Sequence, residues 1–300
     1  MITYIERLND MDNLERYIKG SFLTKINNSF LIKRMRKIKV FESFLKFFLL
    51  HVRRKQALLF LKNGNIYPYD IDSVICDYIY SIKITYRTIH SVINIESIVR
   101  EVFRKKINGA FVEAGTYTGG ASAFALLSLM RNFKDKNLPN YWGFDSFEGM
   151  PSPSFKDGIN AFKWLNPNLS KVNIKMNKSV LIGSHVNLAD YNQCLDYLRN
   201  TNYPSLKINL VKGWFQDTLK MNKKNIGKIA ILRIDGDFYD STLCVLDELY
   251  DNVSKGGVII LDDYGNFEGS RKATHFFFKK KKIKPFLHYV DSGIRYFIKP

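Results

Sequence analysis

Hydrophobic and polar positions follow two periods between residues 229 and 261, and together they predict a strand, a helix and a second strand. Residues 229–234 and 258–261 are short, β-branched apolar runs bounded by glycine or charge, which is typical of buried parallel strands. Over residues 241–253, apolar side chains recur on one face of a helix. A right-handed crossover brings the ends of both strands to one edge of a sheet, where open α/β sheets bind ligands.

Similar patterns of apolar residues predict strands and helices in the rest of the second half of the chain. Further strands are predicted at residues 110–112, 141–144 and 208–211, followed by a terminal hairpin of residues 286–290 and 294–298. Helices are predicted at residues 121–131, 188–198 and 271–282. This alternation predicts an α/β fold with a doubly wound, mostly parallel, seven-stranded sheet.

The first third of the chain has a different pattern. Residues 1–106 are predicted to form a helical, basic N-terminal region that precedes a domain of residues 107–300. Within it, residues 41–52 have helical apolar spacing and are flanked by lysines and arginines. Such a helix either packs on its own domain or a partner subunit, or lies on an anionic membrane, and both alternatives stay open. Nucleic-acid binding is disfavoured, because no recognised binding motif accompanies the charge.

Composition narrows the class of protein. The 300 residues carry a net charge of +18 and are 46% hydrophobic, which is enough for one large domain or two small ones. Three cysteines without a CxxC spacing favour a reducing compartment over a disulfide framework. The start of the chain is polar, and its longest apolar stretch is too short and too charged to span a bilayer. We therefore expect a cytoplasmic protein, with peripheral contact with an anionic membrane as the open alternative.

Acidic residues end both strands of the 229–261 unit. Asp235 and Asp237 follow the first strand, and Asp262 and Asp263 follow the second. A single aspartate after a strand is commonly a turn or cap residue. Four carboxylates at one edge repel one another unless a cation lies among them, and hard oxygen ligands suit a divalent metal such as Mg²⁺. The pattern therefore predicts a metal site at this edge.

A glycine-rich turn follows the first predicted strand and precedes a helix. Its glycines, Gly115, Gly119 and Gly120, allow a ligand to approach the backbone closely. Their spacing is neither the dinucleotide fingerprint nor a P-loop. Asp145, at the end of the next strand, suits a ribose diol. Residues 151–186 are predicted to be irregular, and so long a loop is typical of a functional lid.

Six stretches, in this order, resemble the macrocin O-methyltransferase family, the sugar O-methyltransferases of macrolide and aminocoumarin biosynthesis: FVEAGTYTGG, FDSFEGMP, KGWFQDTL, LRIDGDFYDST, GGVIILDDYG and GSRKA. The resemblance runs from about residue 109 to residue 298. It implies a Rossmann-like class I methyltransferase fold, S-adenosylmethionine as methyl donor, and Mg²⁺-dependent transfer to a sugar hydroxyl of a glycan or glycosylated metabolite. It also implies a homo-oligomer, because related enzymes often self-associate.

The resemblance implies roles for individual residues. Asp235, Asp262 and Asp263 would hold the metal, and Asp237 would be the general base. Apart from the resemblance, the position of His185 in the predicted lid makes it a candidate to contact the acceptor, with a structurally satisfied histidine as the alternative, and Tyr264 is a second candidate. The family commonly has an arginine before the paired glycines, where this chain has Thr118. The residues that would bind the donor follow the first three strands: Glu113, Gly115, Thr116, Gly119, Asp145, Ser146, Trp214 and Asp217.

Two other classes of protein stay as alternatives. A nicotinamide-dependent oxidoreductase would use a similar sheet, but the G-x-G-x-x-G fingerprint is missing and the acidic clusters would have no role. A non-catalytic binding or assembly subunit would keep the fold and use the basic N-terminal region, but it has no need for four clustered carboxylates. Because fold alone does not decide function, metal-dependent methyl transfer is the discriminating observation.

Overall fold

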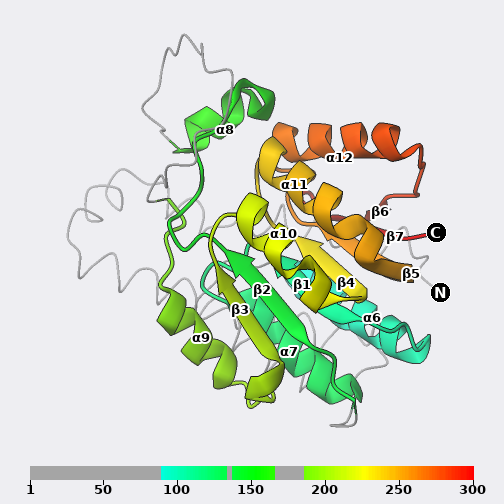
Figure 1. The fold of residues 1–300 in the computed structure, drawn as a ribbon. Helices are drawn as coiled ribbons and strands as arrows, with labels where there is room; N and C mark the ends of the chain where they lie inside the picture. Colours follow the sequence, from blue (N-terminus) through cyan, green and yellow to red (C-terminus); the bar gives the residue numbers. More distant parts are fainter. Residues whose placement is uncertain (1–88, 134–136, 166–185) are drawn as a thin grey trace, which may run out of the picture. The chain divides into compact units, whose positions relative to one another are not determined.

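The computed structural model describes residues 89–133, 137–165 and 186–300 (Figure 1). By compactness the chain divides into two units, Met1–Ile71 and Asp72–Pro300, and all the described residues belong to the second. The predicted basic amphipathic helix of residues 41–52 lies outside the described residues. Among the helices that are described, none combines the length and the apolar character needed to cross a bilayer.

One seven-stranded sheet forms the centre of the described fold, in the order β3-β2-β1-β4-β5-β7-β6. Its strands are β1 (Ala110–Ala114), β2 (Tyr141–Asp145), β3 (Ile208–Lys212), β4 (Ile229–Ile234), β5 (Val253–Leu261), β6 (His288–Tyr289) and β7 (Arg295–Ile298). The first five strands are parallel to one another, and β7 runs antiparallel to both of its neighbours. The predicted doubly wound, mostly parallel, seven-stranded sheet is thereby confirmed.

Helices cover both faces of the sheet (Figure 1). One face carries α10 (Phe215–Ile226), α11 (Tyr239–Leu249) and α12 (Glu268–Lys281). The other carries α6 (Ile89–Arg104) and α7 (Gly120–Phe133), with α9 (Tyr191–Arg199) in contact with α7. The central strands β1 and β4 are therefore buried along their whole length, which explains why all but one residue of each strand is apolar.

The main core lies between the sheet and the helices α10, α11 and α12. Helix α10 was not predicted, although Leu219 and Ile226 lie on one face and Gly227 follows its end. The predicted helix of residues 241–253 was too long. Helix α11 ends at Leu249, and Val253 begins β5, where it pairs with Ile229. A single turn of 3-10 helix, η3 (Tyr250–Asn252), makes this reversal.

The segment of residues 151–186 was predicted to be irregular, and its first part is not. It contains a 3-10 turn, η1 (Phe155–Asp157), and the helix α8 (Gly158–Leu165). Ala161 of α8 packs into a small second core with three residues from other segments, and this burial stabilises the helix. The other members of this second core are Met150, Phe238 and Phe267. Residues 166–185 lie outside the described residues.

Candidate active site

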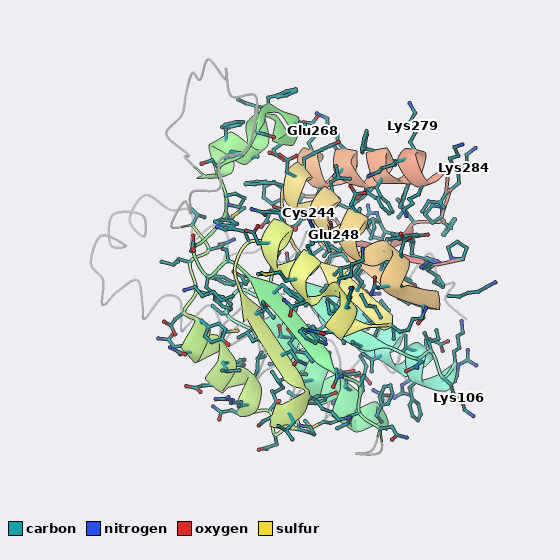
Figure 2. All side chains as sticks on the ribbon, viewed as in Figure 1. Lys106, Cys244, Glu248, Glu268, Lys279 and Lys284 are labelled. Carbon is teal, nitrogen blue, oxygen red and sulfur yellow. The ribbon has the colours of Figure 1, made fainter. Side chains whose placement is uncertain are left out.

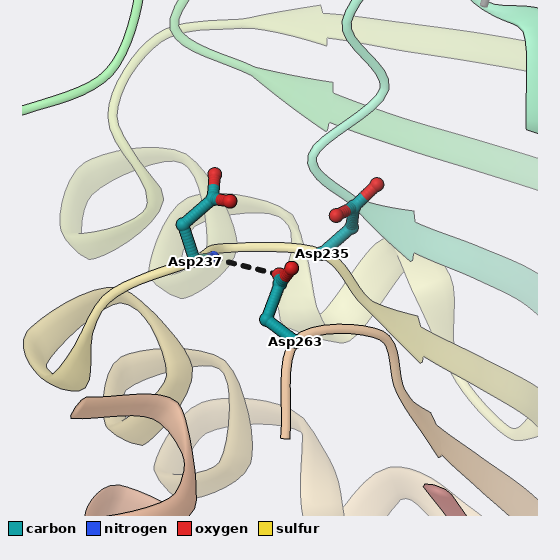
Figure 3. Close-up of side chains that lie close together, drawn as sticks. All are labelled: Asp235, Asp237 and Asp263. Atoms are coloured by element: carbon teal, nitrogen blue, oxygen red, sulfur yellow. Dashed lines mark hydrogen bonds between the residues drawn. The ribbon is translucent and has the colours of Figure 1, made fainter. Parts of the chain in front are cut away.

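Three carboxylates meet at the carboxyl edge of the sheet (Figure 3). Asp235 and Asp237 follow β4, and Asp263 follows β5. One oxygen from each of the three lies within 4.8 Å of one from each of the others. The backbone N–H of Asp237 donates a 3.0 Å hydrogen bond to Oδ2 of Asp263, so the two loops hold each other. We call these three residues the acidic trio.

The loop after β4 turns sharply to bring its two acids together. Asp237 has a left-handed backbone, with φ of 56°, which aspartate tolerates better than most residues. The N–H of Phe238 donates a 2.6 Å hydrogen bond back to the carbonyl of Gly236. At the other end of the loop, the N–H of Asp235 bonds to the carbonyl of Ala114 at the end of β1. The loop therefore presents both carboxylates at the sheet edge.

Asp262 has a different partner. Its Oδ1 lies 2.7 Å from Nη2 of Arg233, a fully buried residue of β4. Nη1 of Arg233 lies 2.5 Å from Glu113 and 3.0 Å from Asp235, so one guanidinium joins acids from three neighbouring strands. Asp262 was predicted as a metal ligand together with Asp235 and Asp263, but in this structure Asp237 completes the acidic trio. The assignment of Asp262 to a metal stays a prediction.

The ion-pair network around Arg233 was not anticipated from the sequence. Burial opposes a charge at this position, but Asp262, Asp235 and Glu113 hold the pKa of Arg233 well above its usual range. Glu113, predicted on the donor side, is buried and also accepts hydrogen bonds from Ser122 and from Tyr141 at 3.0 Å. An arginine inside an otherwise apolar strand was the signal that could have revealed the network.

A cavity of about 360 Å³ opens beside the acidic trio. Four of the predicted donor-binding residues line it, together with two of the trio: Gly115, Asp145, Ser146, Trp214, Asp235 and Asp237. Residues that the sequence analysis did not single out also line it, among them Tyr117, Asn187, Phe215, Gln216, Ser241 and Cys244. The cavity is of the size that small-molecule sites have, and it combines apolar walls with a few polar groups.

Asp145 anchors two turns at the mouth of this cavity. Its Oδ2 accepts a 2.8 Å hydrogen bond from the N–H of Tyr117, and its Oδ1 accepts one of 2.9 Å from the N–H of Phe147. Both donor residues have left-handed backbones, with φ of 52° and 53°. Burial raises the pKa of Asp145, and the two backbone hydrogen bonds oppose that rise.

Gly115 lets the ends of β1 and β4 approach each other. It has a φ of 99°, and a Cβ on it would overlap the carbonyl oxygen of Asp235. No other residue type fits this position without moving the loop that carries Asp235 and Asp237. The glycine-rich turn and the loop of Asp235 and Asp237 are therefore in direct contact.

The remaining predicted site residues do not line the cavity. Thr116 bonds to the carbonyl of Phe144, Gly119 packs near Cys194, and Asp217 lies in the first turn of α10. Tyr264 has its hydroxyl 2.8 Å from Nε2 of His275. His185 lies outside the described residues. The roles predicted for these residues are not tested by the geometry and stay predictions.

The donor set of the acidic trio fits a hard divalent cation. Three carboxylates this close repel one another. One of them, Asp235, forms an ion pair with Arg233. Carboxylate oxygens are the ligands that Mg²⁺ takes in proteins, and one oxygen from each residue leaves further octahedral positions for water or hydroxyl oxygens. Asp235, Asp237 and Asp263 are therefore the residues that could hold Mg²⁺ here.

Comparisons with known proteins agree with this fold and site. A family model described as macrocin O-methyltransferase (TylF) matches residues 87–299. The chain is 32% identical over 173 residues to demethyldecarbamoylnovobiocin O-methyltransferase of Streptomyces niveus, covering 57% of this chain and 58% of that protein. It is 29% identical over 183 residues to 8-demethyl-8-(2,3-dimethoxy-alpha-L-rhamnosyl)-tetracenomycin-C 4'-O-methyltransferase of Streptomyces olivaceus, covering 61% and 62%.

A solved structure, that of the O-methyltransferase NovP, has the same fold with a TM-score of 0.60 and 27% identity, covering 72% of this chain and 82% of that one. The chain spans about three fifths of the length of the curated relatives it matches, at 58% and 62%. The family model covers most of the chain and all of the described residues except the last. From its fold, its acidic sheet edge and this match, the chain belongs to the macrocin O-methyltransferase family.

Proposed function

We propose that this protein transfers a methyl group from S-adenosylmethionine to a sugar hydroxyl of a glycan or glycosylated metabolite, with Mg²⁺ held by the acidic trio. One observation carries the proposal: two carboxylates of the trio line the same cavity as Gly115, Asp145 and Trp214. The names of the relatives support it, because they are O-methyltransferases and one name includes a rhamnosyl group.

The donor would lie across the ends of β1, β2 and β3. The backbone at Gly115 is open to close approach, and the carboxylate of Asp145 has lone pairs left to accept from ribose hydroxyls. Trp214 and Phe215 offer aromatic surface to the adenine. The donor's methyl group would then point toward the acidic loop, because the β1 and β4 loops touch at Gly115.

The acidic trio would act on the acceptor. When bound, Mg²⁺ would supply positive charge that offsets the negative charge developing on the acceptor oxygen. Asp237 lines the cavity, and a carboxylate that gives one oxygen to a cation keeps the other as a base. That oxygen would accept the hydroxyl proton as the acceptor oxygen bonds to the methyl carbon and the carbon–sulfur bond breaks. The products are a methyl ether and S-adenosylhomocysteine.

Three expectations from the sequence have no structural support among the described residues and stay predictions. These are self-association, contact with an anionic membrane and a cytoplasmic location. None of them affects the chemistry proposed for the acidic trio.

The test is calorimetric titration of S-adenosylhomocysteine into the purified full-length protein, with Mg²⁺ and with EDTA. Methyl transfer to a panel of nucleoside-diphosphate sugars and glycosylated metabolites follows. We expect micromolar or tighter binding and transfer that EDTA abolishes. Absence of S-adenosylhomocysteine binding in both conditions would overturn the donor site, and full transfer in excess EDTA would overturn the metal.

A further inference from the structure

A buried carboxylate outside the acidic trio lies at the base of the loop that carries Asp235 and Asp237. It belongs to Asp157, the last residue of η1, which is 1% exposed. Among the described residues no lysine or arginine lies within ion-pair distance of it. A buried carboxylate without a cation needs several hydrogen bonds to be tolerated, so its partners indicate what it holds in place.

Three hydrogen bonds reach Asp157 from two segments. Its Oδ2 accepts from the N–H and the hydroxyl of Ser154, at 2.7 Å and 2.9 Å, which is a local capping interaction. Its Oδ1 accepts a 2.6 Å hydrogen bond from the backbone N–H of Tyr239, which lies 82 residues away in the sequence. The hydrogen bond from Tyr239 is not needed to fold the η1 turn, and it links that turn to α11.

Tyr239 is the first residue of α11 and lies two residues after Asp237. The residue before the helix, Phe238, has no polar side chain that could cap it. Asp157 therefore acts as the cap from a distant segment, and its charge suits the positive end of the helix. The neighbouring Lys156 adds two weaker contacts to the same turn, 4.3 Å from the ring centroid of Tyr239 and 3.3 Å from Asp240.

Close packing leaves little freedom at this contact. A Cβ on Gly269 of α12 would overlap Oδ1 of Asp157 and lie 2.9 Å from the N–H nitrogen of Tyr239. Phe238 packs edge-on against Phe267, with ring centroids 5.5 Å apart. In Figure 2 the neighbouring Glu268 marks the start of α12 beside α8. The η1 turn, α11 and α12 thus meet at one point below the acidic loop.

The left-handed backbone of Asp237 needs such support. A non-glycine residue keeps a left-handed backbone conformation only when the surrounding structure holds it there. Asp263 holds the loop through the N–H of Asp237, and Asp157 holds it two residues later through the N–H of Tyr239. With both ends fixed, the carboxylate of Asp237 stays beside those of Asp235 and Asp263.

We propose that Asp157 is a positioning residue for the acidic trio, which it serves by capping α11 and fixing the loop of residues 235–239. The role of the trio in metal binding rests on the proposed function. The cap itself rests only on the contacts between η1, α11 and α12. The two can therefore be tested separately.

The first readout is hydrogen exchange of the metal-free protein. In Asp157→Ala we expect faster exchange in the peptide that spans residues 235–249, because the N–H of Tyr239 loses its buried acceptor. The matched control is Asp190→Ala, since Asp190 caps α9 by accepting a 2.9 Å hydrogen bond from the N–H of Gln193. That control also loses a helix cap but should leave exchange of residues 235–249 unchanged.

The second readout is Mn²⁺ affinity, measured by electron paramagnetic resonance below the unfolding temperature of each variant. Asp157→Ala should weaken Mn²⁺ binding about tenfold, as loss of supporting residues around metal sites does. It should lower kcat by about 10- to 100-fold and leave S-adenosylhomocysteine affinity unchanged. Asp157→Asn keeps an oxygen that can accept from Tyr239, so it should recover much of the Mn²⁺ affinity and provides a second variant if the alanine protein does not fold.

The inference would be overturned if Asp157→Ala showed the same hydrogen exchange in residues 235–249 and the same Mn²⁺ affinity as the wild-type protein. Asp157 would then be only a local cap of its own turn. Equal effects of Asp157→Ala and Asp190→Ala on Mn²⁺ affinity would also overturn it, since they would reflect general destabilisation. If the wild-type protein binds neither Mn²⁺ nor S-adenosylhomocysteine, the proposed function fails. The exchange experiment still decides the role of Asp157 in that case.

Discussion

Nη2 of Arg233 lies 2.7 Å from Oδ1 of Asp262, and the same guanidinium reaches Glu113 and Asp235. The arginine is fully buried, so its charge is compensated by these carboxylates rather than by water. This places a charged network directly behind the acidic trio. It also separates two adjacent aspartates: Asp262 pairs with Arg233, and Asp263 belongs to the acidic trio.

Removal of Arg233 should strongly destabilise the protein. In Arg233→Met three carboxylates lose their partner, and breaking a buried ion pair typically costs about 3–5 kcal/mol. Urea denaturation followed by circular dichroism measures the free energy of unfolding. The control is Lys280→Ala, which removes a 2.9 Å surface pair with Asp247 and should cost no more than about 1 kcal/mol. Equal losses in the two variants would contradict the role of Arg233.

Asp237 and Asp262 should respond differently to substitution when Mn²⁺ replaces Mg²⁺ as a spectroscopic probe. Asp237→Asn removes a carboxylate of the acidic trio and should weaken Mn²⁺ binding by at least about tenfold, because even supporting residues of metal sites have effects of that size. Asp262→Asn should retain more affinity, since Asp262 pairs with Arg233. The opposite order, with Asp262→Asn losing the metal, would favour the ligand set implied by the family resemblance.

Gly115→Ala should disrupt the donor site. The new Cβ would overlap the carbonyl oxygen of Asp235, so the β1 and β4 loops must separate. We expect loss of S-adenosylhomocysteine binding in calorimetry. Gly227→Ala is the matched control, because Gly227 also has a positive φ, of 66°, but a Cβ there meets nothing within 4 Å. That variant should lose about 1 kcal/mol of stability and keep donor binding.

Donor affinity should depend on pH through Asp145. Burial raises the pKa of this carboxyl, and only the ionised form accepts hydrogen bonds with all its lone pairs. S-adenosylhomocysteine should bind at full affinity at pH values above the raised pKa of Asp145. The affinity should weaken as the pH falls through that pKa. Calorimetry between neutral and mildly acidic pH measures the effect. In Asp145→Asn the affinity should be lower and this pH dependence should disappear; an unchanged pH profile would exclude Asp145 as its source.

The positions of the strands and the clustering of acids at one sheet edge could be predicted from the sequence, because local apolar patterns indicate strands and parallel strands end at a common edge. Short apolar runs indicated β4 and β5, and the acids that follow these two strands had to meet at one edge once the strands were parallel. Helix α10 was missed because its sequence is largely polar and carries three lysines. The contact of its few apolar residues with the main core decides its structure.

The sequence by itself determined the fold class, the edge of the sheet that carries the candidate site and the presence of clustered aspartates at that edge. Only the tertiary structure decided which aspartates face one another. Asp237 belongs to the acidic trio and has a left-handed backbone, whereas Asp262 lies outside the trio and pairs with Arg233. Asp157 caps α11 across 82 residues of chain. Such choices depend on backbone conformation and on contacts between distant segments, which side-chain periodicity does not encode.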